Sequence, residues 1–243
     1  MSIFTPENYR EKILKDDIYG GLLTGDHARA ATKTLLEPDY AFLYAQNLCQ
    51  HLQRLKMSRE GGLLDIGCGA GAITAGFYRL FPNPVYGIDM SPAAIMYAKK
   101  NFAGPEFIWG SADQLDTIEN GSLAVVHARE FYPYSRTRDA VLHMRFLNAA
   151  RPKLMTNGLF CVVQIRDPKV KNGLHSNLRE IQAQALEAGF KRYGILVMTP
   201  QSFFGRFGAL GQFMPIRLAL TVAGKCLEFI MPGRVSYIYW FQA

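Results

Sequence analysis

The chain has 243 residues, 49% of them hydrophobic, which is enough to form one domain with a full core. Its formal net charge of +7 is not clustered, so it favours an anionic substrate or surface only weakly. The four cysteines are too widely spaced to indicate a metal site or a disulfide framework, which favours a cytoplasmic protein. We expect neither a secretion signal nor a membrane-spanning segment, because the N-terminus and the rest of the chain lack a suitable apolar run.

The first 60 residues are predicted to be mainly helical. Thr5 and Pro6 have the residue types of a helix start, and this short helix should end near Lys15. Residues 16–34 form either a surface connection or a flap over a binding site. A longer helix is expected from Pro38, because apolar residues follow at the spacing of a core-facing side: Tyr40, Leu43, Tyr44, Leu48, Leu52 and Leu55.

A glycine loop between a strand and a helix follows this region. Residues 63–66 are predicted as a short buried strand that contains one acid, Asp65. Glycine tolerates a positive φ and has no Cβ, so the backbone can turn sharply and approach a ligand at three alternate positions: Gly67, Gly69 and Gly71. Apolar residues at helical spacing then predict a helix over residues 72–81. This order of elements begins a doubly wound nucleotide-binding unit.

Asp65 distinguishes between two ligands for such a loop. The loop also fits the dinucleotide fingerprint, but a dinucleotide brings an anionic pyrophosphate to the start of the helix, where a carboxylate two residues before the loop would repel it. S-adenosylmethionine has no phosphate and carries an ammonium and a sulfonium, which a carboxylate attracts. Asp65 therefore favours S-adenosylmethionine over NAD.

Two further acids follow predicted strands. The second strand, residues 85–89, ends in Asp89, and a carboxylate at this point accepts hydrogen bonds from both ribose hydroxyls of a nucleotide. A serine and a proline then start a helix over residues 91–101. Asp113 follows the third strand, residues 107–110. The alternative interpretation of each acid is a cap of a helix or turn.

The rest of the chain continues the alternation of strands and helices. The predicted elements are a strand at 123–127, a helix at 139–155 that Pro152 bends or breaks near Ala150, a strand ending near 165, a helix at 177–188, and strands at 192–198 and 235–241. The last two strands should close the sheet, one of them antiparallel. Between them, an apolar insertion packs on the core or on a dimer partner, covers an apolar substrate, or lies on a membrane surface.

The motif Asp65-x-Gly67-x-Gly69-x-Gly71 resembles the first motif of class I S-adenosylmethionine-dependent methyltransferases, and the similarity continues to about Phe190. The resemblance implies an α/β fold with a doubly wound, mainly parallel seven-stranded sheet, a helical N-terminal cap and a helical insertion before the last strand. It implies S-adenosylmethionine as cofactor and S-adenosylhomocysteine as product. The expected single domain, 1–243, consists of a cap (1–60), a Rossmann-like core (61–199 and 234–243) and the insertion (200–233).

The same resemblance implies the cofactor contacts. The glycine loop would pass under the methionine part of the cofactor, Asp89 would bind the ribose, and Asp113 would accept the exocyclic N–H of adenine. Ala124 departs from the family, because many members have an acid near the start of the fourth strand. The expected cofactor-binding residues are Asp65, Gly67, Cys68, Gly69, Asp89, Met90, Ala112, Asp113 and Arg129.

The segment after the fourth strand faces the transferred methyl group in the family. An acceptor pocket is expected between the N-terminal flap, residues 129–134 and the insertion at 199–233. His127 is either a general base or a hydrogen-bonded structural histidine. The candidate catalytic residues are His127, Glu130 and Tyr132. The expected substrate contacts are Tyr19, Phe131 and Tyr134.

The predicted function is methyl transfer to an O or N atom of a small, partly apolar acceptor. The alternatives are a peripheral-membrane methyltransferase acting on a lipid-like acceptor, and a non-catalytic methyltransferase-like subunit, against which the intact acids argue. No nucleic-acid partner is expected, because the sequence has no added RNA-binding domain or basic cluster. Contact with a membrane surface and a homodimer both stay open.

Overall fold

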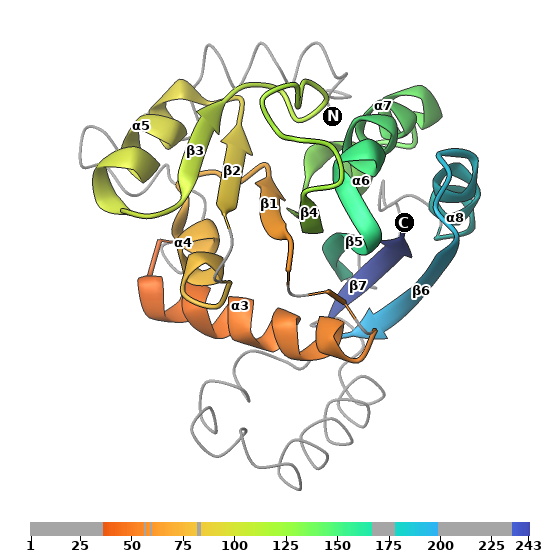
Figure 1. Cartoon of the computed structure of the whole chain (residues 1–243), viewed down its shortest axis with the longest axis horizontal. Coiled ribbons are helices and arrows are strands. Elements are labelled where there is room, and N and C mark those ends of the chain that lie inside the picture. Colours follow the sequence, from red (N-terminus) through yellow and green to blue (C-terminus); the bar gives the residue numbers. More distant parts are fainter. Residues whose placement is uncertain (1–35, 56, 59, 82–83, 167–177, 199–234) are drawn as a thin grey trace, which may run out of the picture.

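A seven-stranded sheet forms the centre of the molecule (Figure 1). The computed structural model describes residues 36–55, 57–58, 60–81, 84–166, 178–198 and 235–243. Its strands are β1 (Gly62–Ile66), β2 (Val85–Asp89), β3 (Glu106–Trp109), β4 (Leu123–Arg129), β5 (Leu154–Arg166), β6 (Arg192–Val197) and β7 (Val235–Gln242). The predicted first helix, the flap with Tyr19 and the insertion at 200–233 lie outside the described residues.

The strand order is β3-β2-β1-β4-β5-β7-β6. Neighbouring strands from β3 to β5 pair in parallel, whereas β7 runs antiparallel to both β5 and β6. The predicted mainly parallel, doubly wound sheet is confirmed, and β7 is its antiparallel strand. The order reverses between β1 and β4, and sheets of this kind bind ligands beyond the carboxyl ends of the strands at such a point.

Helices cover both faces of the sheet (Figure 1). They are α3 (Pro38–Gln53), α4 (Ala72–Tyr78), α5 (Pro92–Asn101), α6 (Tyr132–Arg136), α7 (Ala140–Ala150), the 3-10 helix η2 (Arg151–Lys153) and α8 (Leu178–Glu187). One apolar cluster joins Leu48 of α3 and Phe77 of α4 to the sheet. The other joins Phe146 of α7 and Ile181 of α8 to the opposite face. The helices α3, α4, α7 and α8 therefore bury apolar side chains against the sheet.

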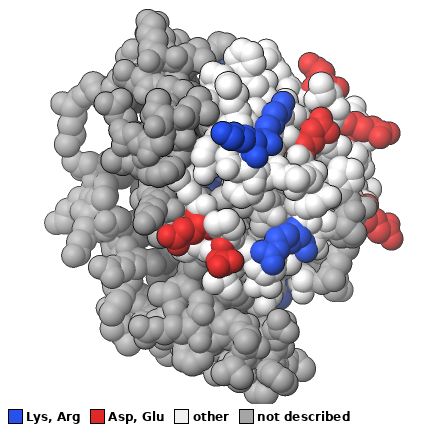
Figure 2. Space-filling view, turned by 90° about the vertical axis from the view of Figure 1, so that its left-hand side faces the viewer, with Lys and Arg blue, Asp and Glu red and all other residues white. Residues whose placement is uncertain are grey.

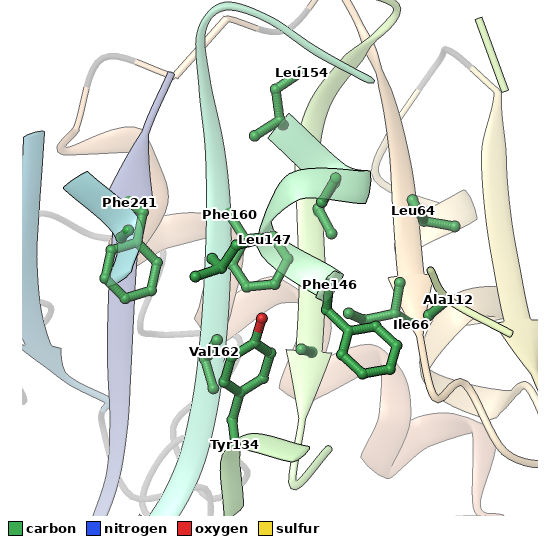
Figure 3. Close-up of a cluster of buried hydrophobic side chains, with 14 of the residues drawn as sticks. Leu64, Ile66, Ala112, Tyr134, Phe146, Leu147, Leu154, Phe160, Val162 and Phe241 are labelled. Carbon is green, nitrogen blue, oxygen red and sulfur yellow. The ribbon is translucent and has the colours of Figure 1, made fainter. Parts of the chain in front are cut away.

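Aromatic side chains fill much of the core on the α7 and α8 face (Figure 3). Phe160 of β5 and Phe241 of β7 have ring centroids 6.3 Å apart, and Phe190 lies within 6.2 Å of both. Full burial of such side chains contributes roughly 1.5–3 kcal/mol each. This packing holds the antiparallel edge against the parallel part of the sheet.

Three boundaries differ from the sequence-based prediction. The predicted break near Ala150 is confirmed, because Pro152 lacks the N–H that a continuing helix needs, but β5 already begins at Leu154, within the range expected to be helical. The aromatic-proline turn after β4 is the short helix α6, whose first turn holds a proline, where the missing N–H is not needed. β4 extends to Arg129, because β5 pairs with it to that point.

The substitution Gly76→Ala tests how tightly α4 packs on α3. A Cβ at this position would lie 2.8 Å from the backbone oxygen of Ala41, so Gly76→Ala forces the helices apart. Overpacking costs about 1–3 kcal/mol, against the roughly 1 kcal/mol that alanine gains in helix propensity. We expect urea unfolding to give a lower free energy of unfolding for Gly76→Ala. Ala75→Gly is the control for propensity alone, and a Gly76→Ala variant that is more stable than wild type would contradict this packing.

Candidate active site

The carboxyl ends of three neighbouring parallel strands form the candidate site. β1, β2 and β4 end at Ile66, Asp89 and Arg129, and β1 lies between the other two. Parallel strands end at the same edge of a sheet, so the segments that follow them converge there. The structure thus brings together the glycine loop, Asp89 and the segment after β4.

The glycine loop turns sharply beyond β1. The φ values of Gly67, Gly69 and Gly71 are 68°, 54° and 85°, in the region that favours glycine. A Cβ at Gly67 would lie 2.9 Å from the ring of Phe131, and a Cβ at Gly71 would lie 2.6 Å from the Cβ of Ala98. Two of the glycines are therefore required by close packing as well as by backbone conformation.

Asp89 ties the glycine loop to the end of β2. Its Oδ2 accepts the backbone N–H of Gly69 at 2.8 Å, and its Oδ1 accepts that of Ser91 at 2.9 Å. Burial raises the pKa of Asp89, and these two donors offset part of the rise. Burial also raises the pKa of the nearby Cys68 thiol well above its ordinary value, with the charge of Asp89 adding to the rise. Cys68 therefore stays protonated and offers no thiolate.

Asp65 lies beneath the loop and is only 3% exposed. The hydroxyl of Thr74 donates to its Oδ2 at 2.7 Å, and Nδ1 of His127 lies 2.7 Å from its Oδ1. Asp65 and His127 are register partners on β1 and β4, so strand pairing places them side by side. Hydrogen bonds to both oxygens offset the cost of burying the carboxylate. The Asp65 carboxylate is thus buried next to the glycine loop and is not exposed at the surface.

His127 is completely buried and is engaged at both ring nitrogens. The hydroxyl of Tyr44, on α3, lies 2.9 Å from its Nε2. Burial raises the pKa of Tyr44 well above its ordinary value, although the charge of Arg129 lowers it in part, so the phenol stays protonated and donates. Nε2 then accepts, and Nδ1 carries the proton that it donates to Asp65. This arrangement corresponds to the structural alternative for His127.

Arg129, the last residue of β4, lies over the ring of Tyr44. The guanidinium carbon is 4.7 Å from the ring centroid, within the range of a cation–π interaction. Its Nη1 is buried and has no hydrogen-bond acceptor among the described residues. The tyrosine therefore contacts Arg129 through its ring and His127 through its hydroxyl.

Three hydrogen bonds organise the ends of β2 and β3. Asp113 accepts hydrogen bonds from the hydroxyl of Ser111 and from the guanidinium of Arg145 on α7. The Asp113 side chain is 9% exposed and that of Arg145 is 61% exposed. Arg145 therefore contacts the carboxylate of Asp113 from the solvent side. The indole of Trp109 donates to the carbonyl of Met90 at 3.1 Å. These contacts fix the segments on which the ribose and adenine assignments depend.

Glu130 forms a bend directly after β4. Its φ of 46° is uncommon for a residue other than glycine. Its backbone N–H donates to the carbonyl of Val163 at 2.9 Å, and its own carbonyl accepts from the hydroxyl of Ser135 at 3.2 Å. The bend leads into α6 and leaves the ring of Phe131 against Gly67. Backbone strain of this kind costs about 1–3 kcal/mol and is concentrated at functional sites.

Tyr132 and Tyr134 point into the protein. Tyr132 is 5% exposed, and Tyr134 is completely buried, with its hydroxyl donating to the carbonyl of His143 at 3.1 Å. Figure 3 shows Tyr134 beside Val162 and Phe146 in the core. This position argues against the expected substrate contact at Tyr134. Tyr19, another expected contact, lies outside the described residues.

Sequence reasoning missed four side chains that organise this edge: Tyr44, Thr74, Trp109 and Arg145. Helical spacing places Tyr44 on a core face, and its hydroxyl is the one sign that it needs a polar partner there. Thr74 lies in the first turn after the loop but has no pattern of its own. The contacts of Trp109 and Arg145 depend on how strands and helices pack.

The described residues contain no group of three or more His, Cys, Asp and Glu side chains that could hold a metal ion. Among the helices in the described part of the chain, none combines the length and the apolar character that crossing a bilayer requires. On the face shown in Figure 2, described Lys and Arg side chains lie among acidic and uncharged ones.

Solved methyltransferase structures share this fold. The phosphoethanolamine N-methyltransferase 2 of Haemonchus contortus, in complex with phosphomonomethylethanolamine and S-adenosylhomocysteine, has a TM-score of 0.54 and 20% identity, covering 82% of this chain and 52% of that one. The geranyl diphosphate C-methyltransferase of Streptomyces coelicolor, in complex with Mg²⁺, geranyl diphosphate and S-adenosylhomocysteine, has a TM-score of 0.54 and 16% identity, covering 82% and 78%. At these identities the likeness establishes the fold alone.

Two relatives are similar over shorter segments. The ribosomal protein L11 methyltransferase of Paraburkholderia phytofirmans is 33% identical over 90 residues, which is 35% of this chain and 30% of that protein. A probable cobalt-precorrin-6B C(15)-methyltransferase (decarboxylating) of Pyrobaculum aerophilum is 34% identical over 77 residues, which is 31% and 37% of the two chains. The chain thus matches about a third of the length of each relative.

The family model of the methyltransferase small domain matches residues 45–194. This range runs from α3 into β6 and includes the glycine loop, Asp89, Asp113 and the segment after β4. The match covers more than half of the chain, and the glycine loop and acids occupy the sheet edge at which the fold binds its ligands. The chain therefore belongs to the methyltransferase small domain family, which confirms its resemblance to class I S-adenosylmethionine-dependent methyltransferases.

Proposed function

We propose that this protein binds S-adenosylmethionine at the carboxyl edge of β1, β2 and β4 and transfers its methyl group to an O or N atom of a small, partly apolar acceptor. The observation that carries the proposal is the glycine loop with one acid beneath it and a second bonded to it, Asp65 and Asp89. Membership of a methyltransferase family supports the reaction class. Two solved neighbours of the same fold are named as methyltransferases of small molecules, and they serve only as an analogy for the acceptor class.

The proposed cofactor contacts have complementary chemistry. The charge of Asp65 favours the ammonium and sulfonium groups above the loop. Each oxygen of Asp89 accepts one backbone N–H and has a lone pair left for a ribose hydroxyl. Asp113 would accept the exocyclic N–H of adenine, with Arg145 and Ser111 holding its carboxylate in place. The other residues assigned to the cofactor are Gly67, Cys68, Gly69, Met90 and Ala112.

Methyl transfer is a displacement at carbon in which the sulfonium leaves with the bonding electrons. The protein has mainly to align the acceptor behind the methyl group and to exclude water. Phe131, which packs against Gly67, is the aromatic residue that we assign to the acceptor side of the loop. Because His127 is hydrogen-bonded at both nitrogens, we assign any proton transfer to Glu130, and a positioning role to Tyr132.

One relative favours a second acceptor class. The similar protein of Paraburkholderia phytofirmans is named as a methyltransferase of ribosomal protein L11, so an amino group of a protein is the alternative acceptor. A lipid-like acceptor is the third class, which rests on the apolar sequence of residues 199–233. The three classes differ in the size and polarity of the molecule that must reach the methyl group.

An assay with S-adenosylmethionine labelled in its methyl group separates these classes. The protein is incubated with a deproteinised small-molecule extract, with ribosomal proteins, or with phospholipid vesicles, and label transfer is counted. We expect label in the small-molecule extract. Label only in ribosomal proteins or only in vesicles would replace the proposed acceptor class. Cofactor binding without transfer to any pool would support the non-catalytic alternative.

Cofactor identity is tested by calorimetric titration with S-adenosylhomocysteine and with NAD. We expect binding of S-adenosylhomocysteine and weaker or undetectable binding of NAD, because Asp65 disfavours a pyrophosphate beside the loop. Tighter binding of NAD than of S-adenosylhomocysteine would refute the assignment.

Asp89→Ala tests the proposed ribose contact. Removal of the carboxylate should weaken S-adenosylhomocysteine binding by about 1–3 kcal/mol, the scale of hydrogen bonds to a charged group, measured by the same titration. Asp89→Asn keeps the shape of the side chain and should bind with intermediate affinity. The control is Asp116→Ala, which removes an exposed acid from the segment before β4. An unchanged dissociation constant for Asp89→Ala would exclude Asp89 from the site.

A further inference from the structure

Arg129 brings a buried, unpartnered donor to the edge where the candidate site lies. Its Nη1 is buried and finds no hydrogen-bond acceptor among the described residues. A buried donor without an acceptor is costly, and the cost is larger for a charged group. In folded proteins, nearly every such group has a partner. We therefore expect Nη1 of Arg129 to donate a hydrogen bond to an acceptor that the described side chains and backbone do not supply.

A chain of buried hydrogen bonds holds the surface on which Arg129 lies. The guanidinium is stacked on the ring of Tyr44, at 4.7 Å from guanidinium carbon to ring centroid. The Tyr44 hydroxyl bonds to His127 at 2.9 Å, and His127 bonds to Asp65 at 2.7 Å. All three partners are buried, so the ring has little freedom to move. The guanidinium is thus positioned by α3 and β1 as well as by its own strand.

A guanidinium with a buried, unpartnered donor binds best to a negatively charged ligand group. The oxygens of Asp65 accept hydrogen bonds from Thr74 and His127, and neither oxygen is bonded to Nη1 of Arg129. A guanidinium presents its donors as a planar fork that matches a carboxylate or a phosphate. We propose that Arg129 binds such an anionic group, which belongs either to the methionine carboxylate of the cofactor or to the acceptor. The inference rests on the proposed function and adds that the ligand group bound by Arg129 carries a negative charge.

Binding measurements on wild type and Arg129→Met distinguish the two sources. The first ligand pair is S-adenosylhomocysteine and its decarboxylated analogue, which keeps the ammonium group. If Arg129 binds the cofactor carboxylate, Arg129→Met should lose about 10- to 100-fold in affinity for S-adenosylhomocysteine and none for the analogue. If Arg129 binds the acceptor, both ligands should bind as in wild type. Inorganic phosphate should then bind the wild-type protein saturated with S-adenosylhomocysteine, but not the variant.

Arg79→Met is the matched control, because Arg79 also stacks on an aromatic ring of α3, that of Phe42, at 3.7 Å. It should change none of these affinities. The proposal is overturned if Arg129→Met binds both cofactor ligands and phosphate as wild type does. It is also overturned if the variant loses affinity for S-adenosylhomocysteine and for the analogue equally, because Arg129 would then support only the fold of the loop.

Two further measurements keep the test decisive. If Arg129→Met does not fold, equal affinity of wild type for the two cofactor ligands, together with no phosphate binding, overturns the proposal by itself. If wild type binds neither cofactor ligand, the proposed function fails. The phosphate titrations of wild type and Arg129→Lys then still test Arg129, because the lysine variant keeps the charge and should retain part of any phosphate binding.

Discussion

A carboxylate inside a sheet is stable only when hydrogen-bond donors surround it, and in this protein the constraint falls on Asp65. Thr74 of α4 and His127 of β4 supply the donors, and Tyr44 of α3 completes the chain. Elements that are distant in sequence are thereby held in one arrangement. The glycine loop begins two residues after Asp65, so its position depends on these same contacts.

The two kinds of interaction in the molecule have different consequences. Apolar clusters on both faces of the sheet supply most of the stability. The polar chain adds little net free energy, because its groups exchange hydrogen bonds with water for hydrogen bonds with one another. Loss of one member, however, leaves the next buried without a partner, at about 1–3 kcal/mol. This series of buried hydrogen bonds therefore fixes one geometry of the glycine loop and adds little to the free energy of unfolding.

Much of the fold follows from local sequence patterns, whereas the site contacts that were missed are long-range. The glycine spacing and the acid in the first strand predict β1, the loop and α4, because all lie within a few residues. Tyr44 and His127 are 83 positions apart, and their contact depends on which side of α3 meets the sheet. Tyr134 is buried in the core, and the sequence alone does not distinguish a core aromatic from a pocket aromatic. The start of β5 was obscured by the helix-like pattern before Pro152.

The central claim is that a cofactor binds at the carboxyl edge of β1, β2 and β4, in contact with both the glycine loop and Asp89. The most direct test is a titration of isotope-labelled protein with S-adenosylhomocysteine, followed by the chemical shifts of the backbone amides. The account predicts that the largest changes occur at Gly67, Gly69 and Ser91, with little change at Tyr193 and Ile195 on the far edge strand β6. Saturable changes confined to that far edge, with unchanged loop amides, would contradict it.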